Sequence, residues 1–191
     1  MKNIAGYTLL IVALVFLAGC IGSPSSQQTV VEIAENSSQV KVETAAPVSY
    51  TNKLYALEKP ANWEVEENQA FTYFKTSAEE DSNNFQENVV VHILPITSGQ
   101  TLIGFFQDSI TELMTTGTNF TVVEHSEASF GDIPAYKIIY LEGEQSMQKK
   151  YLQVFAVKGN NGYVVTYTAP PETFDNYLPE AESIIDSYDV K

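Results

Sequence analysis

The chain has 191 residues, with 24 acidic residues against ten lysines, no arginine and a formal charge of −14. Because proteins recognise nucleic acids through arginine forks and basic stripes, this composition excludes a nucleic-acid partner. Anionic lipid headgroups would repel such a domain, so membrane contact through a basic surface is excluded as well.

The first twenty residues have the order of parts of a lipoprotein signal. A charged start precedes an apolar run over residues 4–17, and Leu17-Ala18-Gly19 stand directly before Cys20. Cys20 is the only cysteine of the chain, so it has no internal disulfide partner, and we expect it to carry a lipid after cleavage of residues 1–19. An uncleaved signal anchor is the alternative, because residues 4–21 approach the ~20 residues that a spanning helix needs.

A polar tether and one domain are predicted after the signal peptide. Residues 20–48 are rich in Ser, Gln, Thr, Val, Glu and Ala and contain no aromatic residue, which is typical of a flexible linker. Aromatic residues begin at Tyr50 and continue to Tyr188, and we therefore assign the folded domain to residues 49–191.

Two N-X-S/T sequons begin at Asn36 and Asn119. They are candidate N-glycosylation sites in a cell that glycosylates exported proteins. Such triplets also occur by chance, so the sequons alone do not establish occupancy.

Strand patterns dominate the predicted domain. Strands are expected, in chain order, at residues 54–57, 70–75, 88–94, 120–127, 136–141, 151–157 and 163–169. Residues 88–94 are mainly apolar on both faces, which is typical of a central strand covered from both sides. Short connections favour antiparallel pairing, and Asn161-Gly162 predicts a tight hairpin turn.

Two helical patterns interrupt the strands. Apolar residues recur at helical spacing over residues 102–114, and Gly117 supplies a stop signal. We expect a second helix to begin near Pro179, with Phe174 and Tyr177 in a preceding turn, because proline suits the first position of a helix. These patterns predict an α+β fold, an α/β/α sandwich with a central, mainly antiparallel sheet.

Five short motifs resemble, in the correct order, those of the PsbP-like domain family. They are Leu57-Glu58-Lys59-Pro60-Ala61-Asn62-Trp63, Asn88-Val89-Val90-Val91, Gly131-Asp132-Ile133-Pro134-Ala135-Tyr136, Tyr163-Val164-Val165-Thr166-Tyr167-Thr168-Ala169 and Ile184-Ile185-Asp186-Ser187-Tyr188. Named members are extrinsic subunits of photosystem II, and a Ran-binding nuclear import factor shares the fold. The resemblance implies an α/β/α sandwich that serves as an accessory or binding module, generally without catalysis. Because the chain lacks arginine and has a predicted lipid anchor and long tether, a photosynthetic role is not supported.

No set of residues in the sequence predicts an active site. Cys20 is assigned to lipid attachment, no G-x-S-x-G elbow is present, and neither histidine has a second ligand at zinc spacing. We expect His92 to be a hydrogen-bonded core histidine and His125 to be solvated near the end of an edge-like strand. The sequence therefore predicts no enzyme and no cofactor, and a hydrolase that uses His92 or carboxylates is the least favoured alternative.

Acidic residues gather in one predicted loop. Residues 79–87 supply enough carboxylate and amide oxygens for a weak calcium site, and the family resemblance adds an association with calcium and manganese. A charge run in a loop is more often simply solvated, so we assign no metal site there. The same reasoning applies to a second acidic patch, Glu64, Glu66 and Glu67.

Two pairs of tyrosines each share one face of a predicted strand. Tyr163 and Tyr167 form one pair, and Tyr136 and Tyr140 form the other. Tyrosines at such positions either fill a core beneath a helix or form an exposed binding surface, and we favour the core.

These features together predict a lipid-anchored protein on the extracytoplasmic side of the cell membrane. Its domain is expected to bind another envelope protein, or to assist in its assembly, without catalysis. The alternative is an extracellular protein that binds calcium, manganese or a small ligand.

Overall fold

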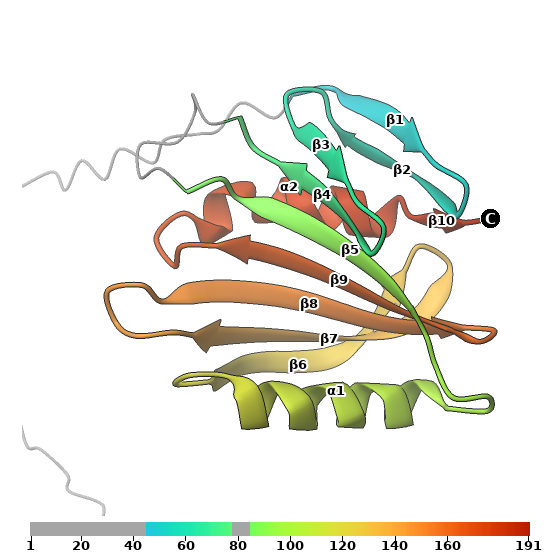
Figure 1. Ribbon diagram of the computed structural model, residues 1–191. Coiled ribbons are helices and arrows are strands. Elements are labelled where there is room, and N and C mark those ends of the chain that lie inside the picture. The colour runs from blue at the N-terminus through green and yellow to red at the C-terminus, as the bar shows by residue number, and fades with distance from the viewer. Residues whose placement is uncertain (1–44, 78–84) are drawn as a thin grey trace, which may run out of the picture. The chain divides into compact units, whose positions relative to one another are not determined.

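The computed structural model describes residues 45–77 and 85–191. In these ranges ten strands form two antiparallel sheets, and two helices pack against them (Figure 1). The large sheet has the order β3-β4-β5-β9-β8-β7-β6 and consists of β3 (Glu64–Glu67), β4 (Phe71–Lys75), β5 (Asn88–Pro95), β6 (Thr121–Phe130), β7 (Ile133–Glu142), β8 (Lys149–Lys158) and β9 (Asn161–Ala169). The small sheet has the order β1-β2-β10 and consists of β1 (Pro47–Thr51), β2 (Tyr55–Pro60) and β10 (Asp189–Val190). The helices are α1 (Leu102–Thr116) and α2 (Phe174–Asp186).

A pairing between strands far apart in the sequence joins the two parts of the large sheet at its centre. Hairpins join β6 to β7, β7 to β8 and β8 to β9, whereas β5 pairs with β9 only after α1 and three further strands have intervened. In that pairing Val91 lies opposite Val165. Both side chains are buried, as expected where two strands rich in β-branched residues meet inside a sheet.

Side chains that alternate along the strands divide the interior into two cores. On β8, Leu152 and Val154 belong to the larger core and Phe155 belongs to the smaller one. The larger core is closed by α2 and the small sheet, and the smaller core is closed by α1. In Figure 1, α1 runs along the lower border of the sheet while α2 passes behind the strands. The predicted α+β fold, an α/β/α sandwich with a mainly antiparallel central sheet, is confirmed.

A buried hydrogen bond joins the loop after β2 to α2. The indole N–H of Trp63 donates to Oε2 of Glu180 at 2.9 Å, and both side chains are almost completely buried. The pair connects residues 117 positions apart in the chain. A donor held against a buried carboxylate fixes the position of both groups, because loss of either partner leaves a desolvated polar atom.

The seven predicted strands are present, but three short strands were not predicted. β1 and β3 are mostly exposed and lack the apolar alternation that marks a half-buried strand, and β10 has only two residues. β1 begins at Pro47, within the last residues assigned to the tether. These strands form because they pair with a neighbouring strand, and the order of apolar and polar residues along the sequence does not reveal that pairing.

The predicted start of the second helix is wrong. α2 begins at Phe174, so Pro179 lies inside the helix. Proline at this position forfeits one backbone hydrogen bond, which disfavours a helix. Phe174 is fully buried and Tyr177 is 7% exposed in the larger core, and the burial of these two rings outweighs that cost.

The predicted hairpin turn is also displaced. Lys158 pairs with Asn161, so the two turn residues are Gly159 and Asn160 and not Asn161-Gly162. Gly159 has the positive φ (63°) that a tight hairpin turn needs. Gly162 lies within β9 for a different reason: a Cβ there would stand 2.6 Å from Cζ of Phe105 on α1. The glycine permits close contact between α1 and the sheet.

We predict that Gly162→Ala destabilises the domain by about 1–3 kcal/mol, because the added methyl group overpacks the contact with Phe105. Chemical denaturation of the variant measures this change. Gly104→Ala in α1 is a matched control, since its new Cβ would meet only the Thr101 side chain at 3.3 Å. Equal stability of Gly162→Ala and the unsubstituted protein would contradict the packing argument.

We predict that Trp63→Phe lowers the free energy of unfolding by about 2–4 kcal/mol, from lost volume and a lost donor to a buried carboxylate. A double-mutant cycle with Glu180→Leu separates the two effects. The coupling between Trp63 and Glu180 is expected to reach ~1–3 kcal/mol. Additive single changes would show that the hydrogen bond contributes no coupling.

Candidate functional site

Several residues singled out from the sequence lie outside the described ranges. These are Cys20, Asn36 and residues 79–84 of the acidic loop, so lipidation and the first sequon remain predictions. Asn119 is described: it is exposed, with φ of 52°, in the turn between α1 and β6. An exposed turn is accessible to a modifying enzyme, but glycosylation at Asn119 also remains a prediction.

The acidic residues that are described do not form a metal centre. Glu87 is fully buried and accepts a hydrogen bond from Oγ1 of Thr173. In the exposed patch on β3, Glu66 is paired with Lys75 at 2.7 Å. Residues 45–77 and 85–191 contain no group of three or more His, Cys, Asp or Glu side chains placed to hold a metal ion.

The tyrosine pairs pack mainly into the two cores. Tyr163 and Tyr167 are buried in the larger core, where the Tyr167 hydroxyl donates to the backbone oxygen of Phe174 at 2.8 Å. Tyr140 is buried in the smaller core, and Tyr136 is half-buried. The favoured core role is therefore correct for Tyr163, Tyr167 and Tyr140. The described tyrosine pairs form no exposed patch.

His92 differs from the prediction. It lies on the α1 side of β5, is half-buried, and its ring stands 4.4 Å from the ring of Phe71. No hydrogen bond joins its imidazole to another described residue, although a hydrogen-bonded core histidine was expected. His125 is exposed on the edge strand β6, as predicted.

His92 is only half-buried because α1 covers only part of its face of the sheet. α1 packs against β7 and β8, whereas on β5 the side chains of Val90, His92 and Leu94 are only half-buried. On the opposite face of β5, Val89 and Val91 are buried, while Ile93 near the end of the strand is half-buried. The expectation that β5 is covered from both sides therefore holds only for the face and stretch that contain Val89 and Val91.

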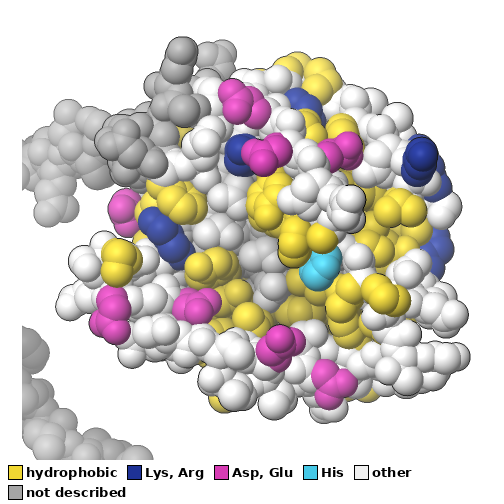
Figure 2. Space-filling view, in the orientation of Figure 1, with side chains coloured by type: hydrophobic (Ala, Val, Ile, Leu, Met, Phe, Trp, Pro, Cys, Tyr) yellow, Lys and Arg dark blue, Asp and Glu magenta, His cyan; other side chains and the backbone are white. Residues whose placement is uncertain are grey.

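A groove occupies the space between α1 and the uncovered strands. Its main cavity has a volume of about 380 Å³, and its lining comes from β5, α1, β8 and β9. The lining residues are His92, Leu94, Phe105, Ser109, Glu112, Leu113, Thr116, Gln153, Phe155 and Val164. Figure 2 views the domain onto this face, with hydrophobic side chains around a hollow and acidic side chains over α1. We call this feature the α1 groove.

Apart from His92, the floor of the α1 groove contains one large polar side chain, Gln153, and its amide is already engaged. Nε2 of Gln153 donates to Oγ1 of Thr166 at 2.9 Å, and Oε1 of Gln153 accepts from the Tyr140 hydroxyl at 3.5 Å. Burial lowers the pKa of the His92 imidazole, which favours its neutral form at pH 7. The floor therefore offers apolar contact and fixed dipoles, and no positive charge.

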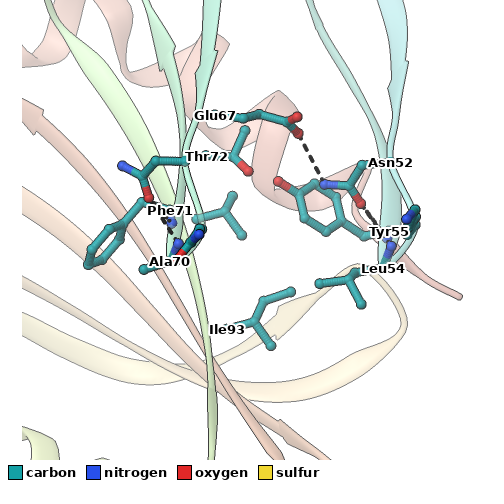
Figure 3. A pocket seen from close by; sticks show the side chains of 12 residues that line it. Asn52, Leu54, Tyr55, Glu67, Ala70, Phe71, Thr72 and Ile93 are labelled. Atoms are coloured by element: carbon teal, nitrogen blue, oxygen red, sulfur yellow. Dashed lines mark hydrogen bonds between the residues drawn. The ribbon is translucent and has the colours of Figure 1, made fainter.

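A second cavity, of about 440 Å³, lies between the two sheets (Figure 3). Tyr55, Val91 and Ile93 form its apolar side, and Leu54 at its rim is 57% exposed. Nδ2 of Asn52 donates to Oε1 of Glu67 at 3.4 Å across its mouth. We call this feature the inter-sheet pocket.

The α1 groove brings no serine together with a histidine base. Ser109, the only serine of the α1 groove lining, donates to the backbone oxygen of Phe105 in its own helix. A nucleophile needs a base within hydrogen-bond reach, and His92 makes no hydrogen bond to a described residue. Both cavities are suited to binding by shape, apolar contact and charge.

Sequence reasoning missed the α1 groove because it depends on how far a helix reaches across a sheet. The apolar stripe of α1 was identified, but its position over β7 and β8 is a tertiary property. One local signal was present: Asp108 and Glu112 stand four residues apart on α1, and no lysine occurs between Lys75 and Lys137. This signal marks an acidic helix surface without saying what lies beside it.

Solved structures with a similar fold come from distant organisms. Cyanobacterial PsbP (CyanoP) from Synechocystis sp. PCC 6803 has 14% identity and a TM-score of 0.58, covering 78% of this chain and 95% of that chain. LpqN, involved in cell envelope biogenesis of Mycobacterium tuberculosis, has 15% identity and a TM-score of 0.59, covering 76% and 90%. The Ran-binding protein Mog1p of Saccharomyces cerevisiae has 8% identity and a TM-score of 0.54, covering 76% and 96%. At these identities the likeness shows the fold alone.

Sequence comparison gives the family. No curated protein sequence matches the chain at a significant level. The sequence profile of PsbP-like proteins, in contrast, matches residues 4–190, nearly the whole chain. The motifs that suggested this resemblance have structural roles, such as the buried hydrogen bond of Trp63 and the pairing of β5 with β9. The chain therefore belongs to the family of PsbP-like proteins.

Proposed function

We propose that this protein is a lipid-anchored, extracytoplasmic accessory protein whose domain binds a partner protein in the envelope through the α1 groove. The observation that carries the proposal is the part of the large sheet that α1 leaves uncovered. A concave surface with an apolar floor and few unsatisfied polar groups is suited to burying side chains of a partner. The structural likeness to LpqN, which is involved in cell envelope biogenesis, is consistent with such a location.

The anchor part of the proposal rests on the lipoprotein signal that ends at Cys20. The predicted tether, residues 20–48, would have a reach of about 30 Å if it behaves as a flexible chain. That distance would let the domain meet the exposed part of a membrane-embedded protein without touching the lipid headgroups. Within the described residues, neither α1 nor α2 is both long and apolar enough to cross a bilayer.

Binding of a small ligand is a second candidate function, favoured by the inter-sheet pocket. Its volume of about 440 Å³ falls within the range of small-molecule sites. Burial raises the pKa of the Tyr55 phenol, and the nearby polar side chains of Thr72 and Asn52 oppose that rise. The buried Tyr55 hydroxyl has no hydrogen-bond partner among the described residues. These three polar side chains lie beside an apolar wall, as in pockets that orient a ligand through a few polar groups.

Photo-cross-linking in intact membranes tests the binding role. We would place p-benzoylphenylalanine at Ser109, in the α1 groove, and as a matched control at Ser183, an exposed serine on α2. The proposal expects one reproducible adduct from position 109 and none from position 183. No adduct from position 109, or the same adduct from both positions, would contradict binding through the groove.

We predict that Cys20→Ser moves the full-length protein from the membrane fraction to the soluble fraction, because the lipid attachment point is lost. Fractionation and mass spectrometry of the N-terminus measure this change, and Ser23→Ala is the control. If mass spectrometry of the unsubstituted protein finds its first 19 residues intact and the Cys20 thiol unmodified, the uncleaved anchor is correct and lipidation is wrong.

A further inference from the structure

The α1 groove is longer than its main cavity. An adjoining cavity, of about 250 Å³, continues along α1 toward its N-terminal end. It shares Leu94, Phe105, Ser109 and Glu112 with the main cavity of the groove. Together they run beside α1 from Thr116 to Gln100. An elongated depression of this kind matches a stretch of polypeptide better than a compact small molecule.

Apolar side chains make up about half of the lining of this extended groove. Leu94 and Ile96 contribute from the end of β5 and the residue beyond it, Phe105 and Leu113 from α1, and Val164 from β9. Phe105 is 5% exposed and packs edge-on against Phe155, so this wall is rigid. A partner that buries apolar side chains here meets a preformed surface, which lowers the entropy cost of binding.

All of the charge that lines the extended groove at neutral pH is negative. Its carboxylates are Asp108 and Glu112, both exposed and both on α1. Neither takes part in the ion pairs of the described residues, which join Lys75 to Glu66, Lys137 to Glu124 and Lys150 to Asp175. The lining contains no lysine, and Asp108 is held by a hydrogen bond from Nε2 of Gln100 at 2.9 Å.

We infer that the α1 groove takes a basic segment of a partner protein, in which lysine or arginine alternates with apolar side chains. The inference rests on the proposed function and names the chemistry of its partner. The apolar side chains would lie against Phe105, Leu113 and Val164, while the cations would face Asp108 and Glu112. Exposed charges contribute little to affinity, so apolar burial should supply most of the binding and charge should supply selectivity.

Binding of short synthetic peptides to the full-length chain tests this inference. The probe is a fluorescein-labelled eight-residue peptide of alternating lysine and phenylalanine, and fluorescence anisotropy measures its affinity at low and high salt. Two comparison peptides alternate glutamate with phenylalanine and lysine with serine. We expect measurable binding of the first peptide alone, with weaker binding at high salt because exposed charges are screened.

Charge variants distinguish the groove from the general acidity of the protein. The double variant Asp108→Asn/Glu112→Gln is expected to weaken binding of the lysine–phenylalanine peptide about threefold to tenfold. Glu182→Gln, an exposed glutamate on α2, is the matched control and should change affinity less than twofold. Ser109→Trp should abolish binding by filling the groove, and Ser183→Trp should not. Circular dichroism confirms that each variant is folded.

Three results would overturn the inference: no binding of the lysine–phenylalanine peptide, equal binding of the lysine–serine peptide, or equal effects of the α1 and α2 variants. Cross-linking from position 109 keeps the two proposals separate. An adduct in membranes together with a failed peptide experiment would retain the proposed function and reject a basic partner segment. Peptide binding without any adduct would support the chemistry of the groove and reject its role in the envelope.

Discussion

A seven-stranded sheet has two faces to cover, and this domain covers them unequally. On one face α2 and the small sheet bury a continuous core that includes Trp63 and Tyr167. On the other face α1 alone closes the smaller core over β7 and β8. A single helix is too narrow for a sheet of this width, so part of β5 stays half-exposed. The α1 groove is the consequence of this mismatch.

The covered face supplies the rigidity that the open face needs. The hydrogen bond from Trp63 to Glu180 ties the loop after β2 to α2, and α2 in turn packs on the far side of β5 and β9. Gly162 lets α1 approach the sheet closely enough for Phe105 to reach the smaller core. The groove is therefore shaped by packed elements on three sides, and a partner would not have to order a loop to bind there.

Local patterns in the sequence were sufficient for the elements that form the two cores. The apolar residues of β5, β8 and β9 and the apolar stripe of α1 appear directly in the sequence, because burial selects their side chains. The elements that the sequence pattern did not predict are determined by strand pairing and by tertiary packing. β3 is four exposed residues held by β4, and the start of α2 depends on Phe174 entering the core in spite of Pro179. The groove was not predicted for the same reason. His92 lies in an apolar strand, and the sequence does not show that α1 stops short of this part of the sheet.

Hydroxyl-radical footprinting of the full-length protein, in its membrane and after extraction, tests the central claim most directly. If the uncovered face of the sheet is the binding surface, His92 and Leu94 should be labelled more strongly after extraction, because the partner no longer covers them. Leu54, which is exposed at the inter-sheet pocket on the other side, should be labelled equally in both states. Unchanged labelling of His92 and Leu94, or a change confined to Leu54, would contradict the account.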